Sequence, residues 1–412
     1  MSKPILVLGG GIAGITAALE AAEAGREVIL IEREPTVGGR VARIHNYFPK
    51  MCPPACGMEI NLRRLEKNPR IQVLAASEVT KADKAGDGWK VTVTQAPQYV
   101  NANCTLCGDC EKVCDCTVPD PHNLGMSEVK AIRLYRNDAW PRRFVFDKDG
   151  CSCGDKVKDA CKYSAIDLDA KETTHDFEVG AIVLATGWHP YAKENLPELG
   201  GGVVKDVIAN VELERLAAPS GPTGGKILRP SNGEAPKKVA FVQCAGSRDV
   251  NNLAYCSGVC CLASLKQATY VKDQLPEAEV TMYYIDRRTP GRNEDVLTTV
   301  SELEGVTLVK GKVGAVTAEG SALKLRVEDV EANKMLEAEA DLVVLATGME
   351  SNLKGSKLPF TVKLDDDGFG LDDPDNNIFV AGVARRPEDV AASVRDATGV
   401  AAKAAVAAGR SA

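Results

Sequence analysis

A glycine-rich motif near the N-terminus constrains the fold of this chain more than any other feature. Residues 5–8 form an unbroken apolar run that is typical of a buried parallel strand. Gly9, Gly11 and Gly14 follow with the spacing G-x-G-x-x-G, and an Ala-, Leu- and Glu-rich helix is predicted from Ile12 onward. The first glycine turns the chain, the second lets the backbone approach a pyrophosphate, and the third lets the helix pack on the strand. The sequence therefore predicts a dinucleotide-binding unit.

An acidic residue at the end of the second predicted strand supports the same interpretation. The apolar run at 28–31 is followed by Glu32, where a carboxylate can accept hydrogen bonds from the hydroxyls of an unphosphorylated ribose. An ordinary α/β domain with a glycine-rich turn is the structural alternative. The register of strand, glycines, helix, second strand and acid favours the dinucleotide site.

Further motifs indicate FAD as the dinucleotide. A second glycine pair at 38–39 precedes Arg40, which resembles two-dinucleotide-binding-domain flavoproteins. Apolar strands closing on Ala-Thr-Gly at 182–187 and 342–348 resemble the crossings between their two nucleotide domains, and 377–383 resembles their last flavin strand. A helix predicted after that strand would direct its N-terminus at the flavin ring. The residues expected to bind FAD are Gly9, Gly11, Ile12, Ala13, Gly14, Glu32, Arg33, Gly39, Arg40, Val79, Ala185, Thr186, Gly187, Gly382 and Val383.

Composition excludes several classes of protein. The 412 residues can hold two or three domains, and a net charge of −7 argues against a surface for nucleic acid or anionic membranes. No run approaches the roughly 18 apolar residues of a membrane span. Because the first strand starts at residue 4, we expect no signal peptide and a cytoplasmic location, where thiols stay reduced. Fourteen cysteines beside four histidines then indicate metal ligation by thiolates.

A ferredoxin-like cysteine run interrupts the predicted FAD domain. It has the spacing C-x2-C-x2-C-x3-C, in which the first three thiolates reach corners of one cubane and the fourth usually serves a second cluster. Residues 151–167 resemble a degraded second ferredoxin half, which supplies a remote ligand. A zinc knuckle is the structural alternative, which the tight three-cysteine run disfavours. We predict one [4Fe–4S] cluster on Cys104, Cys107, Cys110 and Cys161, and leave open a second on Cys114, Cys151, Cys153 and, as a further candidate, Cys116.

A second cysteine-rich region lies where a nicotinamide-dependent reductase would carry its second G-x-G-x-x-G. The strand predicted at 238–242 runs into Gln-Cys-Ala-Gly-Ser-Arg-Asp, so the phosphate-binding glycines are missing and we argue against an NAD(P)H site. Three more cysteines stand at the start of a helix predicted at 262–273, where the helix N-terminus favours anionic thiolates. A redox disulfide, or a packed thiol at Cys261, is the alternative. We predict a further iron–sulfur cluster on Cys244, Cys256, Cys260 and Cys261.

Two other cysteines, Cys52 and Cys56, lie in a proline-rich loop after the flavin glycines. They are candidates for redox catalysis near the flavin ring or for cluster ligation, and buried inert thiols are the alternative. The redox-active pair of thioredoxin-reductase-like enzymes is closer in sequence, so the match is imperfect.

Together these motifs resemble the heterodisulfide reductase A-like flavoproteins. The carriers are the Gly9 motif, the loop from Phe48-Pro49 to Cys56, and the segment from Phe241 to Cys261. The compact length, with one ferredoxin insert, is most similar to the flavoprotein components of the quinone-interacting membrane-bound oxidoreductases of sulfate-reducing bacteria. That resemblance implies adenylylsulfate reductase as soluble redox partner, together with a second flavin/iron–sulfur subunit and a membrane haem/quinone subunit. It also implies a place at the inner face of the membrane through those partners, without direct membrane insertion.

We therefore expect an α/β two-dinucleotide-binding-domain flavoprotein with an inserted ferredoxin-like segment. The predicted function is an oxidoreductase subunit in which FAD and two or three [4Fe–4S] clusters relay electrons between protein partners. An NAD(P)H-dependent disulfide reductase using Cys52 and Cys56 is the alternative, and an assembly platform is a third. The expected segments are the first part of an FAD domain at 1–98, the insert at 99–172, a return to the FAD domain at 173–235, a second Rossmann-like domain at 236–348, and the last part of the FAD domain at 349–412. Within the first segment, residues 71–95 alternate like antiparallel strands and are expected to form a small β-meander.

Overall fold

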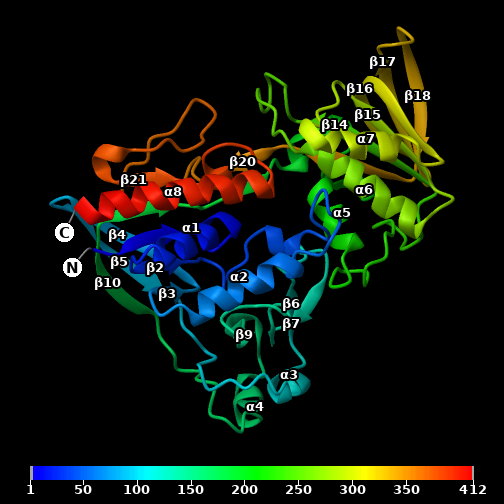
Figure 1. Cartoon of the computed structure of the whole chain (residues 1–412). Helices are drawn as coiled ribbons and strands as arrows, with labels where there is room; N and C mark the ends of the chain where they lie inside the picture. Colours follow the sequence, from blue (N-terminus) through cyan, green and yellow to red (C-terminus); the bar gives the residue numbers. More distant parts are fainter. Residues whose placement is uncertain (1–2, 411–412) are drawn as a thin grey trace.

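The computed structural model describes residues 3–410 and consists of two α/β units, with a smaller cysteine-rich segment attached to the first (Figure 1). The first unit contains a five-stranded parallel sheet of order β21-β11-β1-β2-β3. Its strands come from distant parts of the sequence, so the beginning, the middle and the end of the chain build one sheet. Their bounds are β1 (Ile5–Leu8), β2 (Val28–Ile31), β3 (Ile71–Leu74), β11 (Ala181–Leu184) and β21 (Ile378–Val380).

Two layers cover the faces of this sheet. Alternate residues of β1 point to opposite faces, so Ile5 and Val7 pack against helices while Leu6 and Leu8 pack against a second sheet. The helices are α1 (Ile12–Glu23), α2 (Ala55–Lys67) and α8 (Val390–Arg410). The second sheet, of order β10-β5-β4, is antiparallel and consists of β4 (Ser77–Ala85), β5 (Gly88–Gln95) and β10 (Thr173–Val179).

One part of the expected β-meander is wrong. Residues 71–95 alternate like consecutive antiparallel strands, but β3 pairs in parallel with β2, with Ile71 opposite Val28. The reason is that β3 is the edge strand of the main sheet. An edge strand exposes alternate side chains, and its sequence therefore resembles that of a half-buried antiparallel strand.

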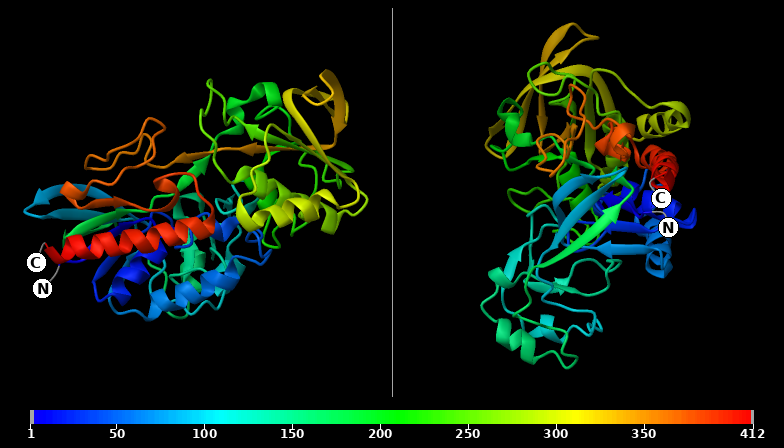
Figure 2. Two further views of the ribbon diagram at one scale, coloured as in Figure 1. Left: turned by 45° about the horizontal axis from the view of Figure 1, so that its top comes forward. Right: turned by 90° about the vertical axis from the view of Figure 1, so that its left-hand side faces the viewer.

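The inserted segment lies between β5 and β10 and projects from the first unit, as the second view of Figure 2 shows. Its small core contains Ile132, Phe144, Phe146 and Val157, together with several cysteines. The segment has little regular structure: two short hairpins, two short α-helices and one 3₁₀ turn (Lys148–Gly150). These are β6 (Thr117–Pro119) with β7 (Glu128–Lys130), β8 (Ile132–Leu134) with β9 (Phe144–Phe146), α3 (Asp109–Val113) and α4 (Gly154–Asp159).

The second unit contains a seven-stranded sheet of order β13-β19-β14-β15-β16-β17-β18, parallel from β13 to β16 and antiparallel beyond. Helices α5, α6 and α7 contribute to the core on one face. The strands are β13 (Val207–Ala209), β14 (Lys238–Ala245), β15 (Glu279–Tyr284), β16 (Val306–Glu319), β17 (Ala322–Asp329), β18 (Lys334–Ala340) and β19 (Leu342–Thr347). The helices are α5 (Asn210–Ala217), α6 (Cys260–Gln274) and α7 (Glu294–Ser301).

A two-stranded ribbon joins the two units. Strand β12 (Trp188–Pro190) follows the first Ala-Thr-Gly and β20 (Met349–Ser351) follows the second, and the two pair antiparallel, with Trp188 opposite Ser351. Both Ala-Thr-Gly motifs thus stand where the chain crosses between the units.

Candidate functional site

A cradle of glycine backbone lies at the end of β1. A Cβ added to Gly14 would lie 1.8 Å from the carbonyl oxygen of Gly9, so this position serves the contact between α1 and β1. Among the described residues, and apart from the neighbouring backbone, an added Cβ at Gly11 would meet only the Cα of Gly39 within 4 Å, at 3.9 Å. Gly11 is also the N-cap of α1 and gives the first turn no side-chain hydrogen bond. The open backbone at Gly11 and the free helix start together suit a pyrophosphate.

Glu32 lies against this cradle at the end of β2. Its Oε2 accepts a hydrogen bond from the Gly10 N–H at 2.6 Å, and its Oε1 accepts one from the Glu34 N–H at 2.8 Å. Burial raises the pKa of the carboxyl group. Each carboxylate oxygen has a further lone pair, so both can still accept a hydrogen bond from a ribose hydroxyl.

A buried hydroxyl without a partner stands beside the cradle. Thr186, in the first Ala-Thr-Gly, has a buried Oγ1 with no hydrogen-bond partner among the residues of the structure that are described. Native proteins rarely leave such a group unsatisfied, and a bound ligand is one way to satisfy it. With the space at Gly11, this orphaned hydroxyl supports a fit between the residues present and FAD.

The other residues predicted to bind FAD occupy the borders of this site. Arg40 donates from its Nε to the Trp188 carbonyl, its guanidinium lies 5.0 Å from the Trp188 ring centroid, and burial lowers its pKa to about 10. Gly382 has a φ of +62° and donates its N–H to Asp396 Oδ2 at 2.8 Å. The side chain of Val79 packs in the core, so only its main chain is available to a cofactor. Ile12 and Ala13 form the first turn of α1, and the backbone of Ala185 lies against Gly9. Both Gly39 and Gly187 have a positive φ. Arg33 is exposed, whereas Val383 is buried.

Sequence reasoning missed a contact from the insert to this site. Arg136 donates from Nη2 to the Val37 carbonyl at 3.1 Å, and its guanidinium lies 2.8 Å from where a Cβ on Gly38 would stand. The Val37 N–H in turn donates to the carbonyl of Trp140. Because partners so far apart in sequence leave no local pattern, nothing in the sequence indicated this contact.

The first predicted cysteine quartet comes together in the insert. Cys104, Cys107, Cys110 and Cys161 line one small cavity together with apolar residues that include Val100, Phe144 and Ile166. Burial raises the pKa of Cys110 to about 11, and the nearby Cys104 and Cys161 thiols add to the rise. A thiolate ligand there therefore needs the positive charge of a metal.

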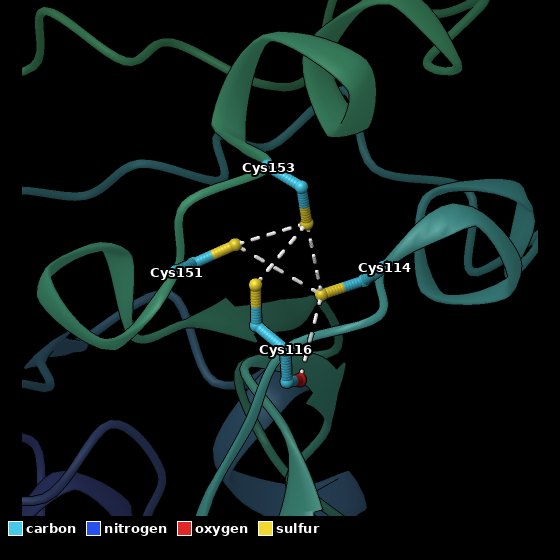
Figure 3. Close-up of side chains that lie close together, drawn as sticks. All are labelled: Cys114, Cys116, Cys151 and Cys153. Carbon is cyan, nitrogen blue, oxygen red and sulfur yellow. Dashed lines mark hydrogen bonds between the residues drawn. The ribbon is translucent and has the colours of Figure 1, made fainter.

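A second quartet lies in the same segment. The sulfur atoms of Cys114, Cys116, Cys151 and Cys153 all lie within 4.8 Å of one another (Figure 3). The sequence left Cys116 as a further candidate, and its sulfur lies within the same distance limit as the other three.

The third quartet lies in the second unit, where β14 ends and α6 begins. Cys244, Cys256, Cys260 and Cys261 line a cavity with Arg248, Asp286 and Arg288. In a dinucleotide-binding unit, a short glycine turn would connect β14 directly to the next helix. Here a loop of residues 246–259 separates β14 from α6, which begins at Cys260. A Cβ on Gly246 would lie 2.7 Å from the Tyr191 ring, so the backbone there is covered by an aromatic side chain. This turn lacks the open glycine backbone that a nicotinamide dinucleotide needs.

Cys52 and Cys56 stand apart from the three quartets. Both are free thiols, with Cys52 half-buried in a loop and Cys56 exposed in α2. Burial raises the pKa of Tyr47 to about 12, and both thiols contribute to the rise, so they lie near its ring. Their role in redox chemistry remains a prediction.

Comparison with known folds and families agrees with this architecture. The family described as FAD dependent oxidoreductase matches residues 4–45, which include the glycine cradle and Glu32. Thioredoxin reductase from T. acidophilum has a similar fold, with a TM-score of 0.54 at 14% identity, covering 99% of this chain and 98% of its own. Thioredoxin reductase from Lactococcus lactis gives 0.53 at 13% identity, covering 99% of both chains. These two likenesses concern the fold alone.

Curated relatives match nearly the whole chain. The A component of the ferredoxin/F(420)H(2)-dependent CoB-CoM heterodisulfide reductase of Methanosarcina acetivorans is 35% identical over 98% of this chain and 53% of its own length. The iron–sulfur A component of the CoB–CoM heterodisulfide reductase of Methanocaldococcus jannaschii is 35% identical over 97% and 64%. The chain thus spans between half and two thirds of these relatives. Within residues 3–410, no helix has both the length and the apolar character to cross a membrane. The chain is therefore similar, along nearly its whole length, to the A components of heterodisulfide reductases, and its N-terminal residues match a family of FAD-dependent oxidoreductases.

Proposed function

We propose that this chain is an electron-transfer subunit of a multi-subunit oxidoreductase and reduces no small substrate of its own. The observation that carries the proposal is the replacement of the second dinucleotide turn by Cys244, Cys256, Cys260 and Cys261, while the first turn keeps an open glycine cradle. FAD, when bound, exchanges electrons singly or in pairs, whereas iron–sulfur clusters carry one electron each. A chain that holds both connects two-electron donors to one-electron carriers.

The chain's own residues position and insulate these groups. Gly11 and Gly39 leave room for the pyrophosphate, and Glu32 and Thr186 supply polar contacts around it. Around Cys104 and its three partners, the apolar residues Val100, Phe144 and Ile166 limit access of water. Around Cys244 and its partners, Arg248 and Arg288 both pair with Asp286, so these three side chains bring one net positive charge to the four thiolates. Because charge and solvent exposure set cluster potentials, the two sites should differ in potential.

The proposal also specifies the partner proteins with which this chain exchanges electrons. Relatives are named as subunits of heterodisulfide reductases, and their names specify ferredoxin, F(420)H(2) and the CoB-CoM heterodisulfide. The resemblance to QmoA, the flavoprotein component of quinone-interacting membrane-bound oxidoreductases, supports different partners here. These are adenylylsulfate reductase, a second flavin/iron–sulfur subunit and a membrane haem/quinone subunit, in sulfate respiration at the inner face of the membrane.

Cofactor content tests the electron-transfer role directly. We expect about one FAD and at least about eight irons per chain, with acid-labile sulfide in equal amount, because two cysteine quartets line cavities suited to cubanes. The measurement is anaerobic purification followed by iron, sulfide and flavin analysis, with EPR of the reduced protein. FAD without iron would contradict the relay and direct attention to Cys52 and Cys56 as a thiol–disulfide pair.

Reaction with pyridine nucleotides separates the relay from a disulfide reductase. In anaerobic stopped-flow mixing, NADH or NADPH should leave the visible flavin absorbance unchanged within the first second, about the turnover time of a slow reductase. The reason is that β14 ends in a cysteine turn whose backbone Tyr191 covers. Dithionite serves as the control that the flavin can be reduced. Rapid bleaching by either nucleotide would support the disulfide reductase instead, and a Cys52→Ser/Cys56→Ser variant would then bleach without reducing a disulfide.

A further inference from the structure

The sulfur atoms of the second quartet are much closer together than ligands of a cubane. Cys153 Sγ lies 3.3 Å from that of Cys151, 3.5 Å from that of Cys116 and 3.6 Å from that of Cys114. The sulfurs of Cys114 and Cys151 are 3.9 Å apart. In Figure 3 all four side chains point toward one common centre.

These separations match a single tetrahedral ion. Four thiolates at about 2.3 Å from zinc stand at the corners of a tetrahedron whose edges are about 3.8 Å. In a cubane each thiolate binds a different corner iron, which places the sulfurs roughly 6 Å apart. The observed distances agree with the first arrangement and leave no room for four irons and four sulfides.

The other two quartets provide an internal comparison. Their cysteines line cavities, and in the described part of the chain the second quartet is the only group of three or more possible ligands with all ligand atoms within 4.8 Å. The same structure therefore contains two open quartets and one closed quartet. The short sulfur–sulfur distances are therefore specific to the second quartet and are not shared by all cysteine clusters of the chain.

The local sequence explains why this quartet is closed. Its ligands come as two C-x-C pairs, one between α3 and β6 and the other between the 3₁₀ turn Lys148–Gly150 and α4. Neither pair has the C-x2-C spacing with which ferredoxins reach neighbouring cubane corners. Cys161, the last cysteine of the degraded ferredoxin half, lines the first cavity and does not reach this quartet.

We propose that Cys114, Cys116, Cys151 and Cys153 hold one zinc ion and not a second ferredoxin-type cluster. Zinc has no redox chemistry, so this site carries no electrons and acts on the structure of the insert. It cross-links residues 114–116 to 151–153 in a segment whose core is small and whose regular elements are short. Segments of this kind commonly need a metal for stability. The insert then contains a single redox centre, the cluster held by the quartet of Cys104.

Metal analysis of the intact chain tests the zinc site. We expect about one zinc and about eight irons per chain after anaerobic purification from a culture supplied with both metals. Zinc K-edge X-ray absorption should give four sulfur neighbours at about 2.3 Å and no iron neighbour. To guard against mis-loading, the metal-free chain is reconstituted with Fe²⁺ and sulfide alone, and iron should stop at about eight. About twelve irons, in either preparation, would overturn the zinc site.

Two cysteine variants assign the metal to its ligands. Cys116→Ser should reduce zinc several-fold while iron and FAD stay at the wild-type level. The matched control, Cys107→Ser, should remove about four irons and leave zinc in place. Loss of iron alone from Cys116→Ser would overturn the proposal, and if that variant does not fold, the absorption spectrum of the wild-type chain decides. Twelve irons would contradict only the zinc site, whereas a chain without iron would contradict the proposed electron transfer.

Discussion

Gly11→Val should abolish FAD binding and leave the rest of the protein intact. The new Cβ enters the space in front of the helix N-terminus, where the nearest atom is the Gly39 Cα at 3.9 Å, and the two methyl groups fill the room for a pyrophosphate. The backbone at Gly11 has φ −76° and ψ −175°, which valine adopts without strain. We expect the FAD affinity to fall by more than about a hundredfold. A hundredfold fall corresponds to a loss of only about 2.8 kcal/mol of binding free energy, which blocking the pyrophosphate site should exceed. Flavin absorbance per chain measures it, with iron content and far-UV circular dichroism as checks of integrity.

Gly14→Ala is the informative contrast to this variant. A Cβ at Gly14 would lie 1.8 Å from the Gly9 carbonyl oxygen, so α1 has to move away from β1 and the core between them opens. This smaller substitution should therefore lower solubility and thermal stability, whereas the larger one at Gly11 should not. Normal flavin content in Gly11→Val would show that the cradle is not the cofactor site.

The features that sequence could predict are those written in local patterns. The strand, glycines and helix from Ile5 to Glu23 and the acidic residue Glu32 follow from periodicity and spacing within a few dozen residues. The first cysteine quartet also has three members in one short run, and its remote member, Cys161, lines the same cavity, as the ferredoxin pattern predicts. The family resemblance and the overall fold rest on the same local motifs.

The features that sequence could not predict depend on how distant segments meet. Whether Cys116 joins Cys151 is decided by the path of the insert between them, and the difference between an open and a closed quartet is a matter of a few ångströms. The contact of Arg136 with Val37 has no local signal. Strand β3 was assigned to the wrong sheet because an edge strand and a half-buried antiparallel strand have the same alternation.

The largest such feature is a buried polar cluster that joins the two units. Glu214, in α5, forms an ion pair with the Lys266 ammonium at 2.9 Å and accepts hydrogen bonds from the Gln267 amide at 2.8 Å and the Tyr270 hydroxyl at 3.3 Å; all three partners belong to α6. It also accepts a hydrogen bond at 2.9 Å from the main-chain N–H of His45, a residue of the FAD-binding unit. Both charged side chains are only 6% exposed. Burial beside this carboxylate raises the pKa of Tyr270, so its hydroxyl stays protonated and donates.

Lys266 extends the cluster to the loop that precedes Cys52. Its ammonium donates to the Asn46 carbonyl at 2.9 Å, and the Asn46 N–H donates to Tyr270 Oη. Helix α6 begins at Cys260 and Cys261, so the helix that carries two cysteines of the third quartet is fixed to the FAD-binding unit by the same residues. The cluster therefore holds the flavin cradle and that quartet in one orientation, which a path for electrons between them requires.

Glu214→Ala should strongly destabilise the protein, because it leaves the Lys266 charge buried without its partner. Breaking a buried ion pair in this way typically costs about 3–5 kcal/mol. For a unit of this size, that loss corresponds to a fall in the thermal midpoint on the order of 10 °C. The matched control is Glu59→Ala, whose carboxylate pairs with Arg63 on the surface of α2 with both side chains more than half exposed, and which should change stability by about 0.5 kcal/mol or less. Thermal unfolding of the cofactor-loaded chain, followed by flavin fluorescence on FAD release and by circular dichroism, measures both variants. If Glu214→Ala shifted the midpoint no more than Glu59→Ala, the cluster would not be what joins the two units. Their orientation would then have to depend on other contacts, such as the β12–β20 ribbon and the hydrogen bond from Arg215 to the Arg43 carbonyl.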